Sequence, residues 1–280
     1  MTQSKEPNVI VHLDERDGGS QIAYITINNA PKLNILHSAL MKDFAAICQD
    51  LAHHQALRAV VVTGAGDKAF VGGADIDEMA SLNADSARTF ITLLHGCCNA
   101  LRKLPVPVIA RIQGYALGGG LELAAACDLR VASDTAVFGM PEVKLGIPSV
   151  IEAALLPTLV GWGRTRHMLL LGESFGATEA ATWGLVERVV PTHQLDDAIE
   201  GYIQSILRAG ARAVRLQKNL IRSWEDLPLH AAIEAGIDVF VAAWESEEPH
   251  RAMSEFKMIK ARAAQALGES AEKSQSPDKE

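Results

Sequence analysis

The chain has 280 residues, of which 48% are hydrophobic and 21% charged, as is usual for a soluble globular protein. The net charge of −8, with no dense lysine or arginine tract, argues against nucleic acid as a partner. No apolar run approaches the roughly 20 residues that span a bilayer, and the N-terminal stretch shows no signal or transit pattern. We therefore expect a cytoplasmic protein without a membrane segment.

The first part of the chain alternates strand and helix patterns. Residues 9–13 and 22–28 are rich in β-branched side chains and flank a turn-like DERDGGS, which predicts a hairpin. Residues 38–54 carry apolar side chains at helical spacing, with Ser38 as the expected N-cap. Buried-strand patterns follow at 58–64 and 107–114. Between them, residues 86–104 have a helical pattern.

The later part of the chain is mainly helical in pattern. We predict strands there only at 128–133, 136–140 and 186–190. Four amphipathic helices follow, and then a polar tail whose composition is typical of disorder. The sequence thus predicts three parts, an α/β core at 1–192, a helical region at 193–263 and a disordered tail at 264–280.

One glycine-rich stretch joins a predicted strand to a predicted helix, namely GYALGGGLELAAACD at 114–128. Such a turn leaves backbone N–H groups unpaired at the positive end of the helix dipole, and glycines let a ligand approach them closely. The turn can therefore hold a phosphate or a developing oxyanion. It fits neither the dinucleotide fingerprint nor the phosphate loop. A tight turn would explain the glycines alone, but Glu122 in an apolar first turn favours a reactive site.

Two other stretches have the same character. FVGGADIDEM at 70–79 offers backbone donors after a predicted strand, and GMPEVKLGIP at 139–148 places Glu142 between a proline and a valine. Each of these features alone has an ordinary structural explanation. Together they supply two glycine-flanked donor sites and two carboxylates in apolar settings.

These three stretches, in this order and at these separations, resemble the crotonase superfamily, and within it the enoyl-CoA hydratases most closely. PKLNIL at 31–36 resembles the family's segment along coenzyme A, and the resemblance covers about residues 8–262. It implies an α/β fold, a crotonase-like spiral of repeated ββα units, with a helical C-terminal trimerisation region. It also implies a homo-oligomer, either a trimer or a hexamer built as a dimer of trimers.

The resemblance also implies roles for particular residues. Glu122 and Glu142 match the acid/base carboxylates, and the backbone N–H groups of Ala74 and Gly119 match the oxyanion hole. The residues expected along coenzyme A and the substrate are Lys32, Leu33, Gly73, Asp75, Ile76, Gly118, Phe240 and Phe256. Lys260 lies one position away from a family lysine that meets the phosphates. No metal and no cofactor are implied, because the coenzyme A thioester is itself the substrate.

The chemistry of these residue types agrees with the resemblance. Two fixed N–H donors stabilise negative charge on a thioester oxygen, and two carboxylates can move the protons of an added water. We therefore expect an enoyl-CoA hydratase that converts a trans-2-enoyl-CoA into a 3-hydroxyacyl-CoA, a reaction of fatty acid metabolism. The alternatives are a Δ3-Δ2-enoyl-CoA isomerase or another crotonase-type CoA lyase and, from another class, a non-catalytic acyl-CoA-binding or scaffold protein, which could include an RNA-binding relative.

The loop after Glu142 departs from the hydratase pattern. Hydratases usually continue from the proline with a glycine-rich run, whereas this chain has Ser149, Val150, Ile151 and Glu152 after Pro148. We expect Glu152 to be an ordinary first-turn helix residue, with a reshaped acyl pocket or a changed proton relay as the alternative. The remaining histidines on predicted helices, such as His95, are expected to be surface or packing residues, and the four cysteines to be free thiols.

Overall fold

The structure is a computed structural model that describes the backbone of residues 7–274 and the side chains of residues 7–262. It divides into two compact units, Met1–Leu207 and Arg208–Glu280, which are described separately.

The first unit is built on two sheets. The larger has six strands in the order β1-β2-β3-β5-β7-β10, and the smaller has four in the order β4-β6-β8-β9. The larger sheet comprises β1 (Val9–Arg16), β2 (Ser20–Ile27), β3 (Leu57–Gly64), β5 (Val108–Ile112), β7 (Leu129–Ser133) and β10 (Arg188–Val190). The smaller comprises β4 (Ala69–Val71), β6 (Tyr115–Leu117), β8 (Val137–Gly139) and β9 (Ser174–Gly176).

Three successive strand pairs place one strand in each sheet, namely β3 with β4, β5 with β6, and β7 with β8. Helices follow the first two pairs: α2 (Ile76–Ala80) and α3 (Ala84–Lys103) come after β4, and α4 (Gly119–Ala125) comes after β6. The third pair leads into the 3₁₀ turns η3 (Pro141–Leu145) and η4 (Ile151–Leu155). This is the predicted spiral of ββα units, and it brings the glycine turns after β4 and β6 side by side, because these strands pair in parallel.

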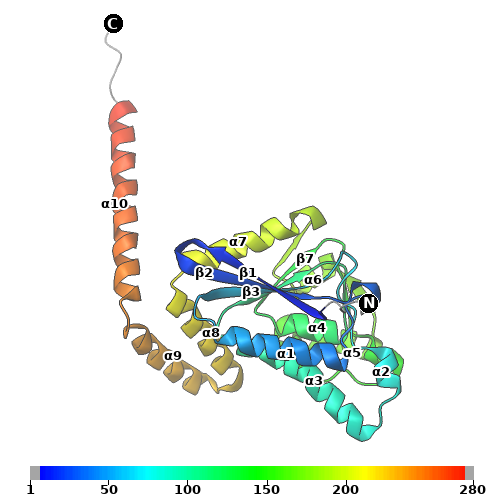
Figure 1. The fold of residues 1–280 in the computed structure, drawn as a ribbon. Helices are drawn as coiled ribbons and strands as arrows, with labels where there is room; N and C mark the ends of the chain where they lie inside the picture. Colours follow the sequence, from blue (N-terminus) through cyan, green and yellow to red (C-terminus); the bar gives the residue numbers. More distant parts are fainter. Residues whose placement is uncertain (1–6, 275–280) are drawn as a thin grey trace, which may run out of the picture. The chain divides into compact units, whose positions relative to one another are not determined.

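Helices cover both faces of the larger sheet (Figure 1). One face packs against α1 (Ser38–Ala52) and α3, whose apolar stripes form a continuous core with the strands. The other face packs against α7 (Leu195–Arg208), which buries Leu195, Ile199 and Ile203 against Val61 and Ile109. The unit is completed by α5 (Leu156–Leu171) and α6 (Ala177–Trp183).

The predicted helices and strands are confirmed, and two details differ in the first unit. The N-cap of α1 is His37, whose Nδ1 accepts a hydrogen bond from the Leu40 N–H at 3.3 Å. Ser38, the predicted cap, instead hydrogen-bonds to the Glu78 carboxylate. The first unit also extends beyond residue 192 to Leu207, because α7 is needed to bury the second face of the sheet.

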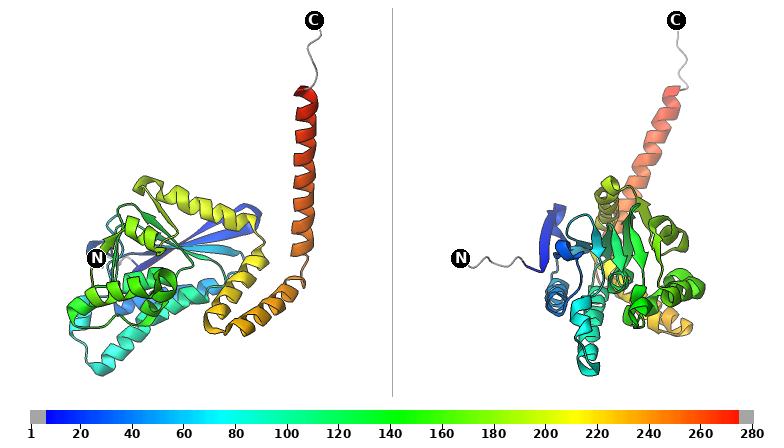
Figure 2. Two further views of the ribbon diagram at one scale, coloured as in Figure 1. Left: turned by 180° about the vertical axis from the view of Figure 1, so that it is seen from behind. Right: turned by 90° about the vertical axis from the view of Figure 1, so that its right-hand side faces the viewer.

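The second unit contains α8 (Ala211–Asp226), α9 (Leu229–Ala243) and α10 (Glu248–Ser274). With α7, these are the four helices that the amphipathic patterns predict. Figure 2 shows α10 as one continuous helix. Its helical backbone reaches Ser274, so most of the tail that we expected to be disordered is helical, while 275–280 lie outside the described residues. Over the described residues, no helix combines the length and apolar character needed to cross a membrane.

Candidate active site

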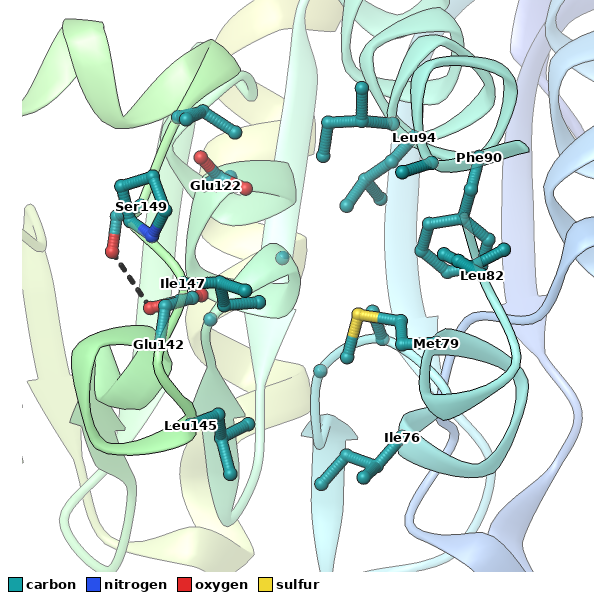
Figure 3. Close-up of a pocket in the computed structure, with 18 of the residues that line it drawn as sticks. Ile76, Met79, Leu82, Phe90, Leu94, Glu122, Glu142, Leu145, Ile147 and Ser149 are labelled. Atoms are coloured by element: carbon teal, nitrogen blue, oxygen red, sulfur yellow. Dashed lines mark hydrogen bonds between the residues drawn. The ribbon is translucent and has the colours of Figure 1, made fainter. Parts of the chain in front are cut away.

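A cavity of about 720 Å³ lies in the first unit (Figure 3). One wall carries two glutamates and the opposite wall carries apolar side chains from α2 and α3. The lining includes three groups of residues: the glycine turns Gly72–Ala74 and Gly118–Gly119; Glu122, Glu142 and Ser149; and the apolar Ile76, Met79, Leu82, Phe90, Ile91, Leu94, Leu145, Ile147 and Val150.

Glu122 sits in the first turn of α4, a helix whose residues are all buried. Its side chain is only 3% exposed, and its Oε1 accepts a hydrogen bond of 3.0 Å from the Ala153 N–H. Burial raises the pKa of Glu122 to about 8; the Ala153 hydrogen bond opposes this rise, and the charges of Glu142 and Glu152 add to it. Burial therefore favours the protonated form of the Glu122 carboxyl near neutral pH.

Glu142 reaches the same cavity from η3, at the end of β8. It is half-buried, and its Oε2 accepts a hydrogen bond of 2.8 Å from the Ser149 hydroxyl. Its Oε1 lies against Gly118, in the space that a side chain at that position would need. Gly118 also has a φ of +50°, which favours glycine. One glycine thus allows both the turn into α4 and the close approach of the carboxylate.

The backbone N–H groups of Ala74 and Gly119 line the cavity without an acceptor among the described residues. The neighbours of Ala74 in the chain are both bonded to the backbone of Leu36. The Leu36 N–H donates to the Gly73 carbonyl at 2.8 Å, and the Leu36 carbonyl accepts from the Asp75 N–H at 2.9 Å. Gly119 is the first residue of α4, so its N–H lies at the positive end of the helix. Both donors therefore lie on rigid elements that can hold an oxyanion.

Of the other residues predicted to contact coenzyme A or the substrate near the glycine turns, only some line the cavity. Ile76, Gly73 and Gly118 line the cavity, whereas Lys32, Leu33 and Asp75 do not. Asp75 is the N-cap of α2, and its Oδ1 accepts hydrogen bonds from two backbone N–H groups of that helix. The segment with Lys32 and Leu33 runs directly beside the turn, because the Leu33 carbonyl accepts from the Gly72 N–H at 2.8 Å.

The apolar wall was not predicted, although the sequence contains a signal for it. Ala87, Phe90, Ile91 and Leu94 line the cavity from one stripe of α3, at the spacing of a helix face. Figure 3 shows Phe90 and Leu94 opposite the glutamates. Such a stripe ordinarily indicates packing against a core, and here part of it faces empty space instead.

Glu152 is not the ordinary first-turn residue that we expected. It is only 3% exposed, and its Oε1 lies 2.9 Å from Nδ1 of His95 on α3. Its Oε2 is buried without a partner among the described residues. His95 is therefore also more than a surface or packing residue. The expectation failed because the contact joins positions 57 residues apart.

The remaining predicted residues lie in the second unit. Phe240 on α9 and Phe256 on α10 are each 67% exposed, and Lys260 is exposed as well. Their contact with coenzyme A stays a prediction. The four cysteines are thiols, as expected, and all of them are buried. No group of three or more metal-ligating side chains occurs in the part of the chain that the structure describes.

Comparison with known proteins agrees with this geometry. The family model described as enoyl-CoA hydratase/isomerase matches residues 17–261. The short-chain-enoyl-CoA hydratase of Clostridium acetobutylicum is 35% identical, over 89% of this chain and 94% of the relative. The crotonyl-CoA hydratase of Syntrophomonas wolfei is 33% identical, over 89% and 94%. The crystal structure of an enoyl-CoA hydratase from Bacillus anthracis superimposes with a TM-score of 0.84 at 32% identity, covering 90% of this chain and 96% of that one.

These matches and the spiral of ββα units show the crotonase superfamily. The chain belongs to the enoyl-CoA hydratase/isomerase family.

Proposed function

We propose that the protein is an enoyl-CoA hydratase, a hydro-lyase that adds water to a trans-2-enoyl-CoA to give a 3-hydroxyacyl-CoA. One observation carries the proposal: the cavity presents Glu122 and Glu142 together with the N–H groups of Ala74 and Gly119, which have no acceptor among the described residues. The names of the similar hydratases support the same reaction.

The two backbone donors would polarise the thioester. Attack on the β-carbon moves negative charge onto the thioester oxygen, where the N–H groups of Ala74 and Gly119 stabilise it as an enolate. Removing one such donor typically costs about 3–4 kcal/mol of transition-state stabilisation. No metal or other cofactor enters the proposed reaction.

The two glutamates would handle the protons. The water gives a proton to the ionised carboxylate as its oxygen bonds to the β-carbon, and the protonated carboxyl gives its proton to the α-carbon. The pair begins and ends with one proton, so the addition is balanced. Because burial raises its pKa to about 8, Glu122 is the carboxyl that favours this proton near neutral pH.

The apolar wall supports an acyl group larger than crotonyl. The cavity of about 720 Å³ extends along the apolar Met79, Leu82 and Phe90, which outline a hydrocarbon-binding wall; the polar Asn83, Arg88 and Thr92 also line the cavity. We propose that straight or bulky hydrocarbon acyl groups of medium length bind there.

The test is the loss of the ultraviolet band of the conjugated thioester, measured with crotonyl-CoA and with longer enoyl-CoAs. We expect the wild type to hydrate them, and Glu122→Gln and Glu142→Gln to be slower by roughly 10² or more. An inactive wild type across all chain lengths would contradict the proposal.

A second candidate is a Δ3-Δ2-enoyl-CoA isomerase or related CoA lyase that uses mainly Glu142. The observation in its favour is the loop after Pro148, which lacks the glycines usual in hydratases. Conversion of a 3-enoyl-CoA without hydration of 2-enoyl-CoAs would establish it. A silent acyl-CoA-binding protein is the candidate from another class, and turnover that is lost in Glu122→Gln would exclude it.

We also propose a trimer or a dimer of trimers. Large apolar side chains are exposed on the second unit, among them Leu229, Ile233 and Phe240 on α9 and Phe256 on α10. Exposed apolar surface of this extent supports burial against another copy of the chain. Light scattering coupled to size-exclusion chromatography gives the state, and Ile233→Asp is expected to shift it toward the monomer.

A further inference from the structure

One five-residue loop, Ser149–Ala153, contacts both catalytic carboxyls. At its start the Ser149 hydroxyl donates to Glu142 at 2.8 Å, and at its end the Ala153 N–H donates to Glu122 at 3.0 Å. The loop is therefore the structural link between the two groups that exchange protons with the substrate. Whatever fixes the loop also fixes their separation and orientation.

The loop is held in a conformation that its own residues disfavour. Ile151 has a φ of +42°, a left-handed value that β-branched residues rarely adopt. Such a residue persists only where its surroundings impose the conformation. Ile151 packs against the core, and the next residue, Glu152, is almost completely buried.

The buried Glu152 has one polar partner among the described residues. Nδ1 of His95 lies 2.9 Å from its Oε1, and the His95 side chain is 48% exposed to solvent. A buried carboxylate without a partner is strongly disfavoured, so this contact decides whether Glu152 can stay inside. His95 follows Leu94, which lines the cavity, whereas neither His95 nor Glu152 lines it.

We propose that His95 and Glu152 are positioning residues of the reaction, which anchor the Ser149–Ala153 loop to α3 and thereby hold Glu122 and Glu142 in register. The proposal rests on the proposed hydration, because it assigns these residues to the same site. Neither residue touches the substrate. They act through the loop and through the charge on Glu152.

The charge on Glu152 also affects the titration of Glu122, which a purely structural anchor would leave unchanged. The titratable groups packed around this point are Glu122 on α4, Glu142 on η3, and His95, Cys97 and Cys98 on α3. The charge on Glu152 contributes to the raised pKa of Glu122, after burial and after the charge on Glu142. Removing that charge therefore lowers the pH at which Glu122 loses its proton.

The first experiment compares two replacements of His95. Asparagine carries an amide nitrogen near the position of imidazole Nδ1, whereas leucine carries no donor. We expect His95→Leu to lower kcat about tenfold or more, with KM within about threefold, because small displacements of reacting groups are costly in rate. We expect His95→Asn to stay within about threefold of the wild type in both. The matched control is His167→Leu, which breaks an exposed histidine–carboxylate contact of 3.5 Å on α5.

The second experiment removes the charge and keeps the hydrogen bond. In Glu152→Gln, we expect the limb of the pH profile of kcat/KM that titrates near pH 8 to move to lower pH, by roughly 0.5–1.5 units. Infrared titration of the protonated Glu122 carboxyl, identified by its loss in Glu122→Gln, is expected to show the same shift without any substrate. That measurement separates this proposal from the proposed function, because it needs no turnover.

Wild-type kcat in His95→Leu together with an unshifted Glu122 titration in Glu152→Gln would overturn the proposal. If His95→Leu does not fold, the proposal is tested by the Glu122 titration in Glu152→Gln and by the rate of His95→Asn. If the wild type hydrates no enoyl-CoA, the proposed function fails, and the infrared shift still tests the coupling of Glu152 to Glu122.

Discussion

The two glutamates of the cavity lie in contrasting settings. Glu122 is part of a fully buried helix and is held by the backbone N–H of Ala153. Glu142 lies on a half-exposed 3₁₀ turn and is held by a side-chain hydroxyl. Both residues are glutamates, so the difference in their burial and hydrogen bonding comes from the elements on which they lie.

In the proposed reaction, this contrast provides one site with both an acid and a base. Burial disfavours the charged form of a carboxyl, and this places the shared proton on Glu122. The more accessible Glu142 can exchange hydrogen bonds with Ser149 and with water. In the proposed reaction the two roles are therefore separated by depth, without two different residue types.

Gly118→Ala is expected to have the largest effect, because it disturbs both glutamates at once. A Cβ at this position would collide with Oε1 of Glu142, and the residue would keep an unfavourable φ of +50° at the start of the helix that carries Glu122. We expect kcat to fall by about 10²–10³. Gly201→Ala, a substitution into open space on α7, is the control and should leave the rate unchanged. Equal rates for the two variants would show that Glu142 does not need its place against Gly118.

The second prediction concerns the effect of the buried Glu122 on the free energy of unfolding at different pH values. The pKa of Glu122 rises from an ordinary value of 4.5 in the unfolded chain to about 8 in the folded protein. Between these values the folded state binds more protons than the unfolded state, so the free energy of unfolding falls as pH rises through this window. Relative to Glu122→Gln, the wild type should lose about 2–4 kcal/mol between pH 5 and pH 8. Denaturant unfolding of both proteins at several pH values measures the difference, and parallel curves would contradict it.

Local patterns predicted most of the helices and strands, whereas the spiral arrangement and the roles of the site residues came from the family resemblance. The pattern GYALGGGLEL predicts a strand, a tight glycine turn and a helix, and so predicts the turn before Glu122. The four C-terminal helices follow from their amphipathic spacing in the same way. In these segments the residues that determine the structure are neighbours along the chain.

The features that the sequence did not predict depend on distant contacts. Glu152 at the start of η4 looks like a residue that favours a helix dipole, and only the packing of α3 beside it shows that it is buried and paired with His95. The helical stripe that includes Phe90 and Leu94 predicts a buried face, but not that part of this face borders a cavity. Asp75 was assigned to the ligand by the family resemblance, and its N-cap role appears only once α2 is in place.

The third prediction tests the apolar wall and leaves both glutamates untouched. Ala87 is a small residue of the α3 stripe, and Ala87→Phe places a ring in the cavity. We expect kcat/KM for an eight-carbon enoyl-CoA to fall about tenfold relative to crotonyl-CoA, since pocket contacts of this size discriminate by about 1–3 kcal/mol. Thr89→Phe puts the same ring on an exposed part of the same helix and should not change the ratio. An unchanged ratio in Ala87→Phe would mean that the acyl chain does not run along α3.

The smallest effect is expected at Ser149, the residue that holds Glu142. Ser149→Ala removes one hydrogen bond to a half-exposed carboxylate, and water can replace it, so we expect kcat to fall about 3–10-fold. Ser149→Thr keeps the hydroxyl and should stay close to the wild type. A loss as large as that of Glu142→Gln would mean that the accessible glutamate is as rigidly held as the buried one. In that case depth alone would not separate the two roles, and the Ser149 hydroxyl would belong with the acid/base groups that act on the substrate.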